Sequence, residues 1–102
     1  MEINMYAIVT NFIAQNEMQM DMWIQFFKSS TAKLMTDAGA IQISITKTAS
    51  NKAVLLNVFP NKEIAMKARA IVADRKKQVK ELIKIETNEG EVVFNQNSLT
   101  QE

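Results

Sequence analysis

The sequence predicts an α+β fold in which a four-stranded antiparallel sheet carries two helices on one face. Residues 40–59 are typical of a hairpin, a helix-like segment flanks the hairpin on each side, and both ends of the chain contain strand-like segments. The resulting order is strand, helix, strand, strand, helix, strand. Strand-helix-strand crossovers are nearly always right-handed, so two of them place both helices on the same face. We expect one domain spanning residues 1–102, with a polar tail at about 95–102.

The central hairpin shows the clearest pattern. Ile41, Ile43 and Ile45 alternate with the polar residues Gln42, Ser44 and Thr46, which is the period of a half-buried strand. Residues 49–52 supply a polar turn, and residues 54–59 form the return strand.

The first strand is predicted at residues 6–14, and it is mainly apolar on both faces. Asn16 can cap a helix that follows, with Gln19 three residues later. This helix should run to about Asp37 and stop at Gly39. Its inner stripe is predicted to comprise Met20, Trp23, Ile24, Phe27, Thr31 and Leu34.

The second helix begins after Pro60, with Asn61 as its cap. Its apolar stripe is predicted to contain Ile64, Ala68, Ile71, Val72, Val79 and Leu82. The end of this helix is ambiguous, because residues 80–87 also alternate like a strand. The helix can stop near Lys80, with a last strand through residues 86–94 and a bulge or turn at Gly90; residues 92–94 are strand in either version.

Composition removes several function classes. The chain has 12 basic and 11 acidic residues, so there is no basic field to hold nucleic acid. It has no cysteine and no histidine, which excludes thiolate chemistry, histidine-ligated metals and serine-histidine-aspartate triads. No segment approaches the roughly 20 apolar residues of a membrane span. We expect a soluble, cytoplasmic protein without a metal site.

Three kinds of residue are candidates for a ligand pocket. Arg75 falls within the apolar stripe of the second helix, where a guanidinium needs an anionic partner, from a ligand or from a nearby acid. Asn11 and Asn57 stand at strand positions that disfavour asparagine, where a pocket wall, a dimer contact or an edge facing water would explain them. An aromatic wall for a flat ligand is predicted from Tyr6, Trp23, Phe27 and Phe59, although core packing explains aromatics equally well.

The sheet face without helices is predicted to be partly apolar, from Val54 or Leu55, part of the first strand, and Val92 or Val93. Contiguous exposed apolar patches of more than a few hundred Å² are uncommon in monomers. The sequence therefore favours a homodimer that packs sheet against sheet.

This element order is the ferredoxin-like plan, and the chain resembles the dimeric α/β-barrel superfamily, in particular the antibiotic-biosynthesis-monooxygenase-like group. The resemblance covers about residues 5–94 and includes one local match, Phe59-Pro60-Asn61-Lys62-Glu63, at the junction of third strand and second helix. Phe59 stands where relatives often carry tryptophan. Asn11 is similar to an asparagine of haem-degrading relatives, but the histidine they need is absent.

The resemblance implies cofactor-independent oxygenation of a small aromatic or polyketide-like compound. The alternative is a non-catalytic module of the same fold that binds a small molecule or assembles with itself. A closed cavity bearing Arg75, Tyr6 or Asn11 would favour the first, and a filled core would favour the second.

Overall fold

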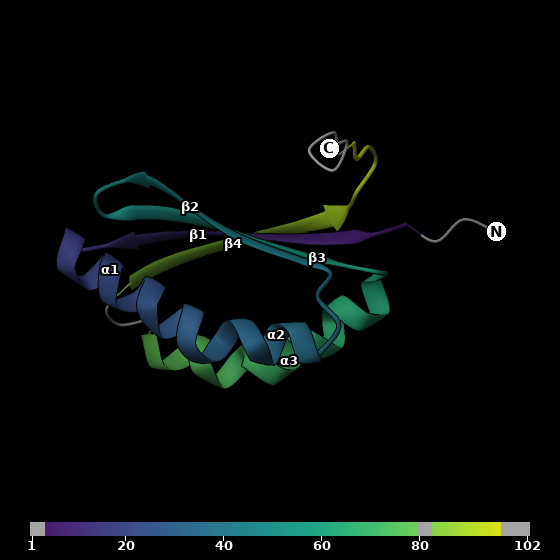
Figure 1. Ribbon diagram of the computed structural model, residues 1–102, viewed down its shortest axis with the longest axis horizontal. Coiled ribbons are helices and arrows are strands. Elements are labelled where there is room, and N and C mark those ends of the chain that lie inside the picture. Colours follow the sequence, from purple (N-terminus) through teal and green to yellow (C-terminus); the bar gives the residue numbers. More distant parts are fainter. Residues whose placement is uncertain (1–3, 80–82, 97–102) are drawn as a thin grey trace, which may run out of the picture.

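The computed structural model describes residues 4–79 and 83–96, and for residues 74–79 it describes the backbone only. The predicted fold class is confirmed: one sheet of four antiparallel strands with helices on one face (Figure 1). The elements are β1 (Tyr6–Ala14), α1 (Glu17–Phe26), a π-helix (Phe27–Thr31), α2 (Ala32–Asp37), β2 (Gln42–Ala49), β3 (Lys52–Phe59), α3 (Lys62–Val79) and β4 (Ile83–Glu91). Within the described ranges, no helix is sufficiently long and apolar to pass through a bilayer.

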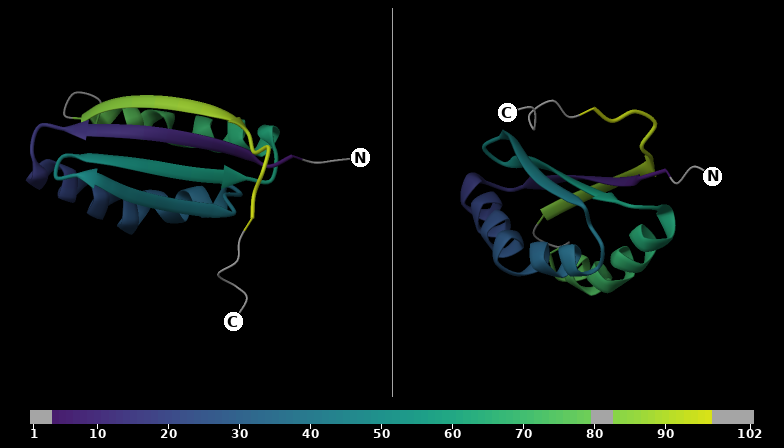
Figure 2. Two further views of the ribbon diagram at one scale, coloured as in Figure 1. Left: turned by 90° about the horizontal axis from the view of Figure 1, so that it is seen from above. Right: turned by 45° about the vertical axis from the view of Figure 1, so that its right-hand side comes forward.

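The strand order β2-β3-β1-β4 places β1 and β3 in the centre of the sheet. The helices lie along one face, and the opposite face is open in both views of Figure 2. Alternate residues of β1 point to the two faces, as the pleat requires. Tyr6, Ile8, Thr10 and Phe12 are buried beneath the helices, whereas Ala7, Val9, Asn11 and Ile13 belong to the open face.

The open face has an apolar centre and polar edges. Strand pairing brings Ala7 beside Val58 and Val9 beside Leu56 in the centre. Polar residues flank this centre on both sides: Gln42, Ser44 and Thr46 on β2, and Lys84, Glu86 and Asn88 on β4. Of the two alternatives predicted for β3, Val54 is on this face and Leu55 is not.

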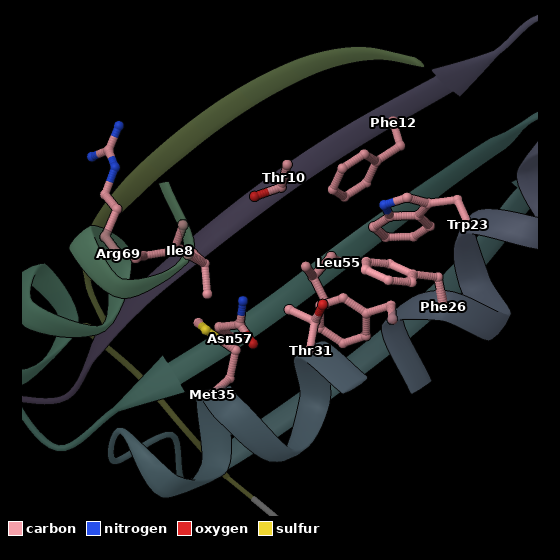
Figure 3. A pocket seen from close by; sticks show the side chains of 12 residues that line it. Ile8, Thr10, Phe12, Trp23, Phe26, Thr31, Met35, Leu55, Asn57 and Arg69 are labelled. Carbon is pink, nitrogen blue, oxygen red and sulfur yellow. The ribbon is translucent and has the colours of Figure 1, made fainter. Parts of the chain in front are cut away.

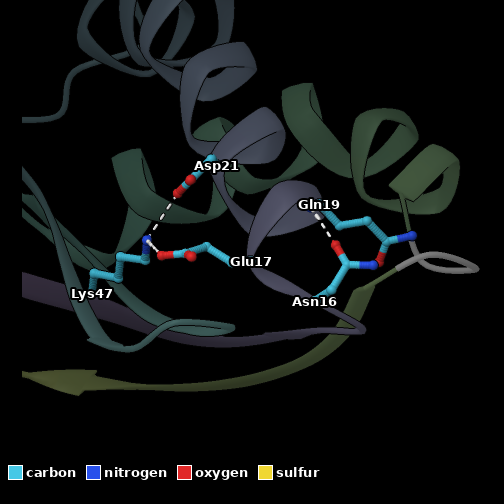
Figure 4. A network of polar contacts seen from close by, with 5 residues as sticks. All are labelled: Asn16, Glu17, Gln19, Asp21 and Lys47. Atoms are coloured by element: carbon cyan, nitrogen blue, oxygen red, sulfur yellow. Dashed lines mark hydrogen bonds and ion pairs between the residues drawn. The ribbon is translucent and has the colours of Figure 1, made fainter.

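The first helical segment begins as predicted. Asn16 Oδ1 accepts a hydrogen bond from the Gln19 backbone N–H at 2.9 Å, which satisfies one of the free donors of the first turn (Figure 4). The Gln19 side chain accepts from the backbone N–H of Gln15, one residue before the expected capping-box partner.

Lys47 ties β2 to α1. Its Nζ lies 2.9 Å from Asp21 Oδ1 and 3.1 Å from Glu17 Oε2 (Figure 4). The hydrogen bonds to Asp21 and Glu17 raise the pKa of Lys47. The pair of carboxylates therefore keeps this ammonium charged and holds the turn end of the hairpin against the helix.

The last strand ends earlier than predicted. β4 stops at Glu91, so the expectation that residues 92–94 are strand is wrong. The reason is the length of the partner, because β1 begins at Tyr6, the residue that pairs with Glu91. One further bond joins Val92 N to Met5 O at 2.8 Å. Beyond it, Val93 and Phe94 are 93% and 79% exposed, and the chain turns to the open side of the sheet (Figure 1).

The two glycines of the chain differ in what they permit. Gly39 ends α2 with φ 118°, and a Cβ there would lie 2.6 Å from Ile64 Cγ2. Gly90 is a regular β4 residue paired with Ala7, not the predicted bulge or turn, and a Cβ there would meet nothing within 4 Å.

Gly39→Ala is therefore expected to lower the free energy of unfolding by about 1–3 kcal/mol, because alanine is strained at this φ. Gly90→Ala is the matched control. It should be neutral or stabilise by up to about 1 kcal/mol, because a strand glycine has excess unfolded-state entropy. Urea unfolding of both variants measures the difference. Equal stabilities of the two variants would contradict the role assigned to Gly39.

Candidate functional site

The buried residues form two clusters that meet beneath the middle of the sheet. One cluster centres on Phe12, Trp23 and Phe27. The other centres on Tyr6, Met35 and Phe59. Between them, the inner face of the sheet carries two buried polar residues, Thr10 and Asn57, which are 2% and 4% exposed.

An apolar cavity of about 70 Å³ occupies this boundary (Figure 3). It is formed by β1, β3, the first helical run and α3. The lining residues are Ile8, Thr10, Phe12, Trp23, Phe26, Phe27, Thr31, Met35, Leu55, Asn57, Arg69 and Val72. An engineered apolar cavity that binds benzene measures about 150 Å³, so a single ring requires some movement of the lining. Phe26 is the aromatic residue of the lining that is exposed to solvent, at 45%.

Aromatic rings form one end of the cavity. The Phe12 and Trp23 rings are 3.9 Å apart between centroids, and the Trp23 and Phe27 rings are 5.6 Å apart. The ring planes are tilted against each other by 36° in the first pair and by 35° in the second. Such a wall offers apolar contact area and ring faces to a flat ligand.

The π-helix Phe27–Thr31 places two lining residues. The buried positions Trp23, Phe27, Thr31 and Met35 follow one another at steps of four residues. An α-helix turns about 100° per residue, so repeated steps of four drift away from the sheet. The wider π turn takes up part of this drift and buries Met35, next to the predicted Leu34, which is partly buried against the same cluster. Single π turns often occur at functional sites.

Asn57 is the chemically unusual residue of the cavity. Its Oδ1 is buried and has no hydrogen-bond partner among the described residues. Figure 3 shows the amide between Ile8, Thr31 and Met35. A buried acceptor that lacks a partner costs about 1–3 kcal/mol. A ligand with a donor group would remove this cost.

The opposite end of the cavity is charged. Arg69 lines it and forms a direct ion pair with Glu89 Oε2, while Tyr6 donates its hydroxyl proton to Glu89 Oε1 at 3.0 Å. Burial of the phenol, followed by its hydrogen bond to the Glu89 carboxylate, raises the pKa of Tyr6. Glu89 is thus held by two donors, one from the sheet and one from α3.

The raised pKa of Tyr6 gives a pH-dependent prediction. Tyr6 is the only tyrosine, so absorbance at 295 nm reports its ionisation alone. We expect a midpoint above the usual value of about 10. The unfolded chain loses this proton first, so stability should fall as pH rises from about 10 towards the folded-state pKa.

Glu89→Gln should lower the Tyr6 midpoint, because the carboxylate that disfavours the phenolate is removed. Glu63→Gln, in the first turn of α3, makes the same change of charge on the surface and should leave the midpoint unchanged. A Tyr6 midpoint that does not respond to Glu89→Gln would contradict the contact.

The predicted pocket residues are distributed over three places. Trp23, Phe27 and Asn57 line the cavity. Tyr6 and Phe59 are buried in the neighbouring cluster, with Tyr6 linked to the cavity through Glu89.

Asn11 lies on the open face, paired with Val54 and Glu86, and does not line the cavity. Arg75 lies outside the residues whose side chains are described. The inner stripe of α3 includes Ala65, Ala68 and Val72, whereas the predicted member Ile71 is 51% exposed.

Arg69 and Glu89 were missed by the sequence analysis. Arg69 adjoins Ala68 in the helix and reads as a surface residue, and Glu89 comes from a strand whose extent was ambiguous. Thr10 lies within the predicted first strand, but no pattern marked it as a cavity residue. Among the described residues, no group of three or more histidines, cysteines or acids could hold a metal ion.

In sequence, no family model and no curated protein matches the chain. Solved structures do match. A dimeric ferredoxin-like protein from an uncultured marine organism has a TM-score of 0.78 at 15% identity, over 90% of this chain and 98% of that one. The chain has the ferredoxin-like fold. This confirms the predicted fold class.

Two further structures with this fold belong to proteins that are described as an oxygenase or a possible oxidoreductase. A protein of unknown function from Bacteroides thetaiotaomicron, described as a possible oxidoreductase, has a TM-score of 0.73 at 18% identity, over 89% of this chain and 100% of that one. SnoaB from Streptomyces nogalater, a cofactor-independent oxygenase, has a TM-score of 0.70 at 13% identity, over 95% of this chain and 98% of that one. At these identities the likeness concerns the fold.

Proposed function

We propose that the cavity binds a small, single-ring aromatic compound that carries a hydroxyl group. The observation that carries this proposal is the buried Oδ1 of Asn57 in the wall of an apolar cavity, for which the described residues supply no hydrogen-bond donor. A hydroxyl proton would satisfy this acceptor, and the ring would lie against Trp23 and Phe27. A core built for stability alone would place an apolar side chain at position 57.

The size of the cavity limits the ligand. At about 70 Å³ it is smaller than a benzene-sized cavity, so a polycyclic, polyketide-like compound does not fit without a large opening. A single ring needs only a rearrangement of side chains such as Phe26. The resemblance implies either a small aromatic or a polyketide-like compound, and the size of the cavity favours the small aromatic compound.

The reaction we propose for this ligand is oxygenation without a cofactor, as described for SnoaB, which shares the fold. An electron-rich phenol can supply the electrons itself: a ring C–H and the O–H become two C=O groups, one oxygen atom enters the ring, and the other leaves as water. Asn57 would orient the hydroxyl group, and the apolar lining would exclude bulk water.

Binding and oxygenation are tested separately. Trp23 is the only tryptophan, so its indole N–H gives a single NMR signal at the cavity wall. We expect phenol to shift this signal in a saturable way. With hydroquinone under ¹⁸O₂, we expect hydroxybenzoquinone with one labelled oxygen atom, the other labelled atom leaving as water, and a dependence of turnover on Asn57.

Binding without incorporation of ¹⁸O would favour the alternative, a non-catalytic binding module. Absence of binding would overturn the proposal. Asn11→Leu is a matched control for Asn57→Leu, because Asn11 lies on the other face of the sheet. It should leave both measurements unchanged.

We further propose that the protein is a homodimer through the open face. Val9, Val54 and Leu56 are half-buried on this face without a helix over them, and the marine structure with this fold is described as dimeric. Native mass spectrometry should give twice the 11.6 kDa chain mass. A monomer at micromolar concentration would contradict the proposed interface.

A further inference from the structure

The charged end of the cavity contains a cation whose charge is already neutralised. Arg69 lines the cavity, and its guanidinium is paired with Glu89. The Glu89 side chain is 22% exposed and the Arg69 side chain is 45% exposed. Because Tyr6 holds the other oxygen of Glu89, the carboxylate is fixed in position beside Arg69.

We infer that Glu89 makes the cavity selective for neutral ligands over carboxylates. This inference rests on the proposed binding of a small molecule in the cavity. Glu89 is then a specificity-determining residue. It pairs with Arg69, the cation that an anionic ligand would need.

Two features oppose an anionic ligand. An ionised carboxylate loses its hydration on entry and requires a paired charge in return, but Arg69 is already paired. The carboxylate is also an acceptor only, so it cannot satisfy the Asn57 acceptor as a hydroxyl can. A neutral phenol meets neither difficulty.

The sheet register places the two determinants in one row. Ile8 pairs with Asn57 on β3 and with Glu89 on β4, and all three belong to the inner face. With strands about 4.8 Å apart, Asn57 and Glu89 lie roughly 10 Å from each other. A ring compound anchored at Asn57 therefore comes close to the charge of Glu89.

The test compares phenol, benzamide and benzoate by titration of the Trp23 indole N–H signal at pH 7. These probes share a ring and differ in charge. For the natural protein we expect phenol and benzamide to bind at least about tenfold more tightly than benzoate. In Glu89→Gln, which keeps an acceptor for Tyr6, benzoate affinity should rise by roughly threefold to tenfold, with phenol affinity unchanged.

Two further variants identify the cause. The double variant Glu89→Gln with Arg69→Gln should lose the gain for benzoate, because the freed cation is then absent. Glu63→Gln, an equal change of charge in the first turn of α3, should leave all affinities unchanged.

The failures are distinguishable. If none of the probes shifts the Trp23 signal, the proposed binding function is overturned, and this inference falls with it. If phenol binds but benzoate binds equally well, or if Glu89→Gln does not improve benzoate binding, the selectivity is overturned while the binding function stands.

Discussion

Replacing Asn57 by leucine is expected to stabilise the protein and to abolish binding of hydroxyl-bearing ligands. The substitution removes a buried acceptor that has no partner in the part of the chain that the structure describes, and it fills part of the cavity. Relief of the unmet hydrogen bond should raise the free energy of unfolding by about 1–3 kcal/mol. For a domain of this size each kcal/mol corresponds to a Tm increase of roughly 4–8 °C.

Thermal unfolding and the Trp23 NMR titration measure the two effects in the same samples. If Asn57 is retained for function, its replacement should increase stability and abolish binding at the same time. Asn11→Leu makes the same exchange on the open face and should leave ligand binding intact. A clear loss of stability in Asn57→Leu would instead show that the amide has a structural role.

Phe27→Ala is expected to destabilise the protein by about 3–5 kcal/mol, which is the usual cost of removing a buried phenylalanine. Phe27 is 4% exposed, it packs against Trp23, and it begins the π-helix. The new void would also enlarge the cavity. Denaturant unfolding at 25 °C measures the loss.

Phe26→Ala is the matched control, because the neighbouring residue is of the same type and is 45% exposed. It should cost about 1 kcal/mol or less. Similar losses for the two variants would mean that Phe26 is packed more tightly than the structure indicates, and the proposed opening beside it would then be wrong.

Most of the fold could be predicted from local patterns. The alternation of Ile43 and Ile45 with polar residues located β2, the Asn16 cap located the start of α1, and Gly39 located the end of α2. These signals are local, because a residue's neighbours in sequence determine its face and its capping bonds.

The errors occurred where distant contacts decide. The end of β4 depends on where β1 begins, so no pattern near Val92 could reveal it. That Met35 joins Leu34 in the core depends on how the helical run packs against the sheet. Ile71 matches the helical period, but it is exposed because it lies on the side of α3 that does not pack against the sheet.

The candidate site was only partly predictable. Trp23, Phe27 and Asn57 could be selected because aromatic residues and a strand asparagine are visible in the sequence. That Asn57 lies inside and Asn11 outside follows from strand pairing across the sheet. The charge of Arg69 is neutralised because β4 lies next to β1. This placement brings Glu89 beside α3, although Arg69 and Glu89 are 20 residues apart in the sequence.

The sequence alone therefore determined the element order, the helix caps and the absence of cysteine and histidine chemistry. Those properties depend on composition and on short-range periodicity. Packing between elements distant in the chain determined the cavity, the burial of the Asn57 acceptor away from any donor of the described residues, and the Tyr6–Glu89–Arg69 contacts. A void and a missing partner are properties of three-dimensional neighbours, so they exist only once the sheet and helices have come together.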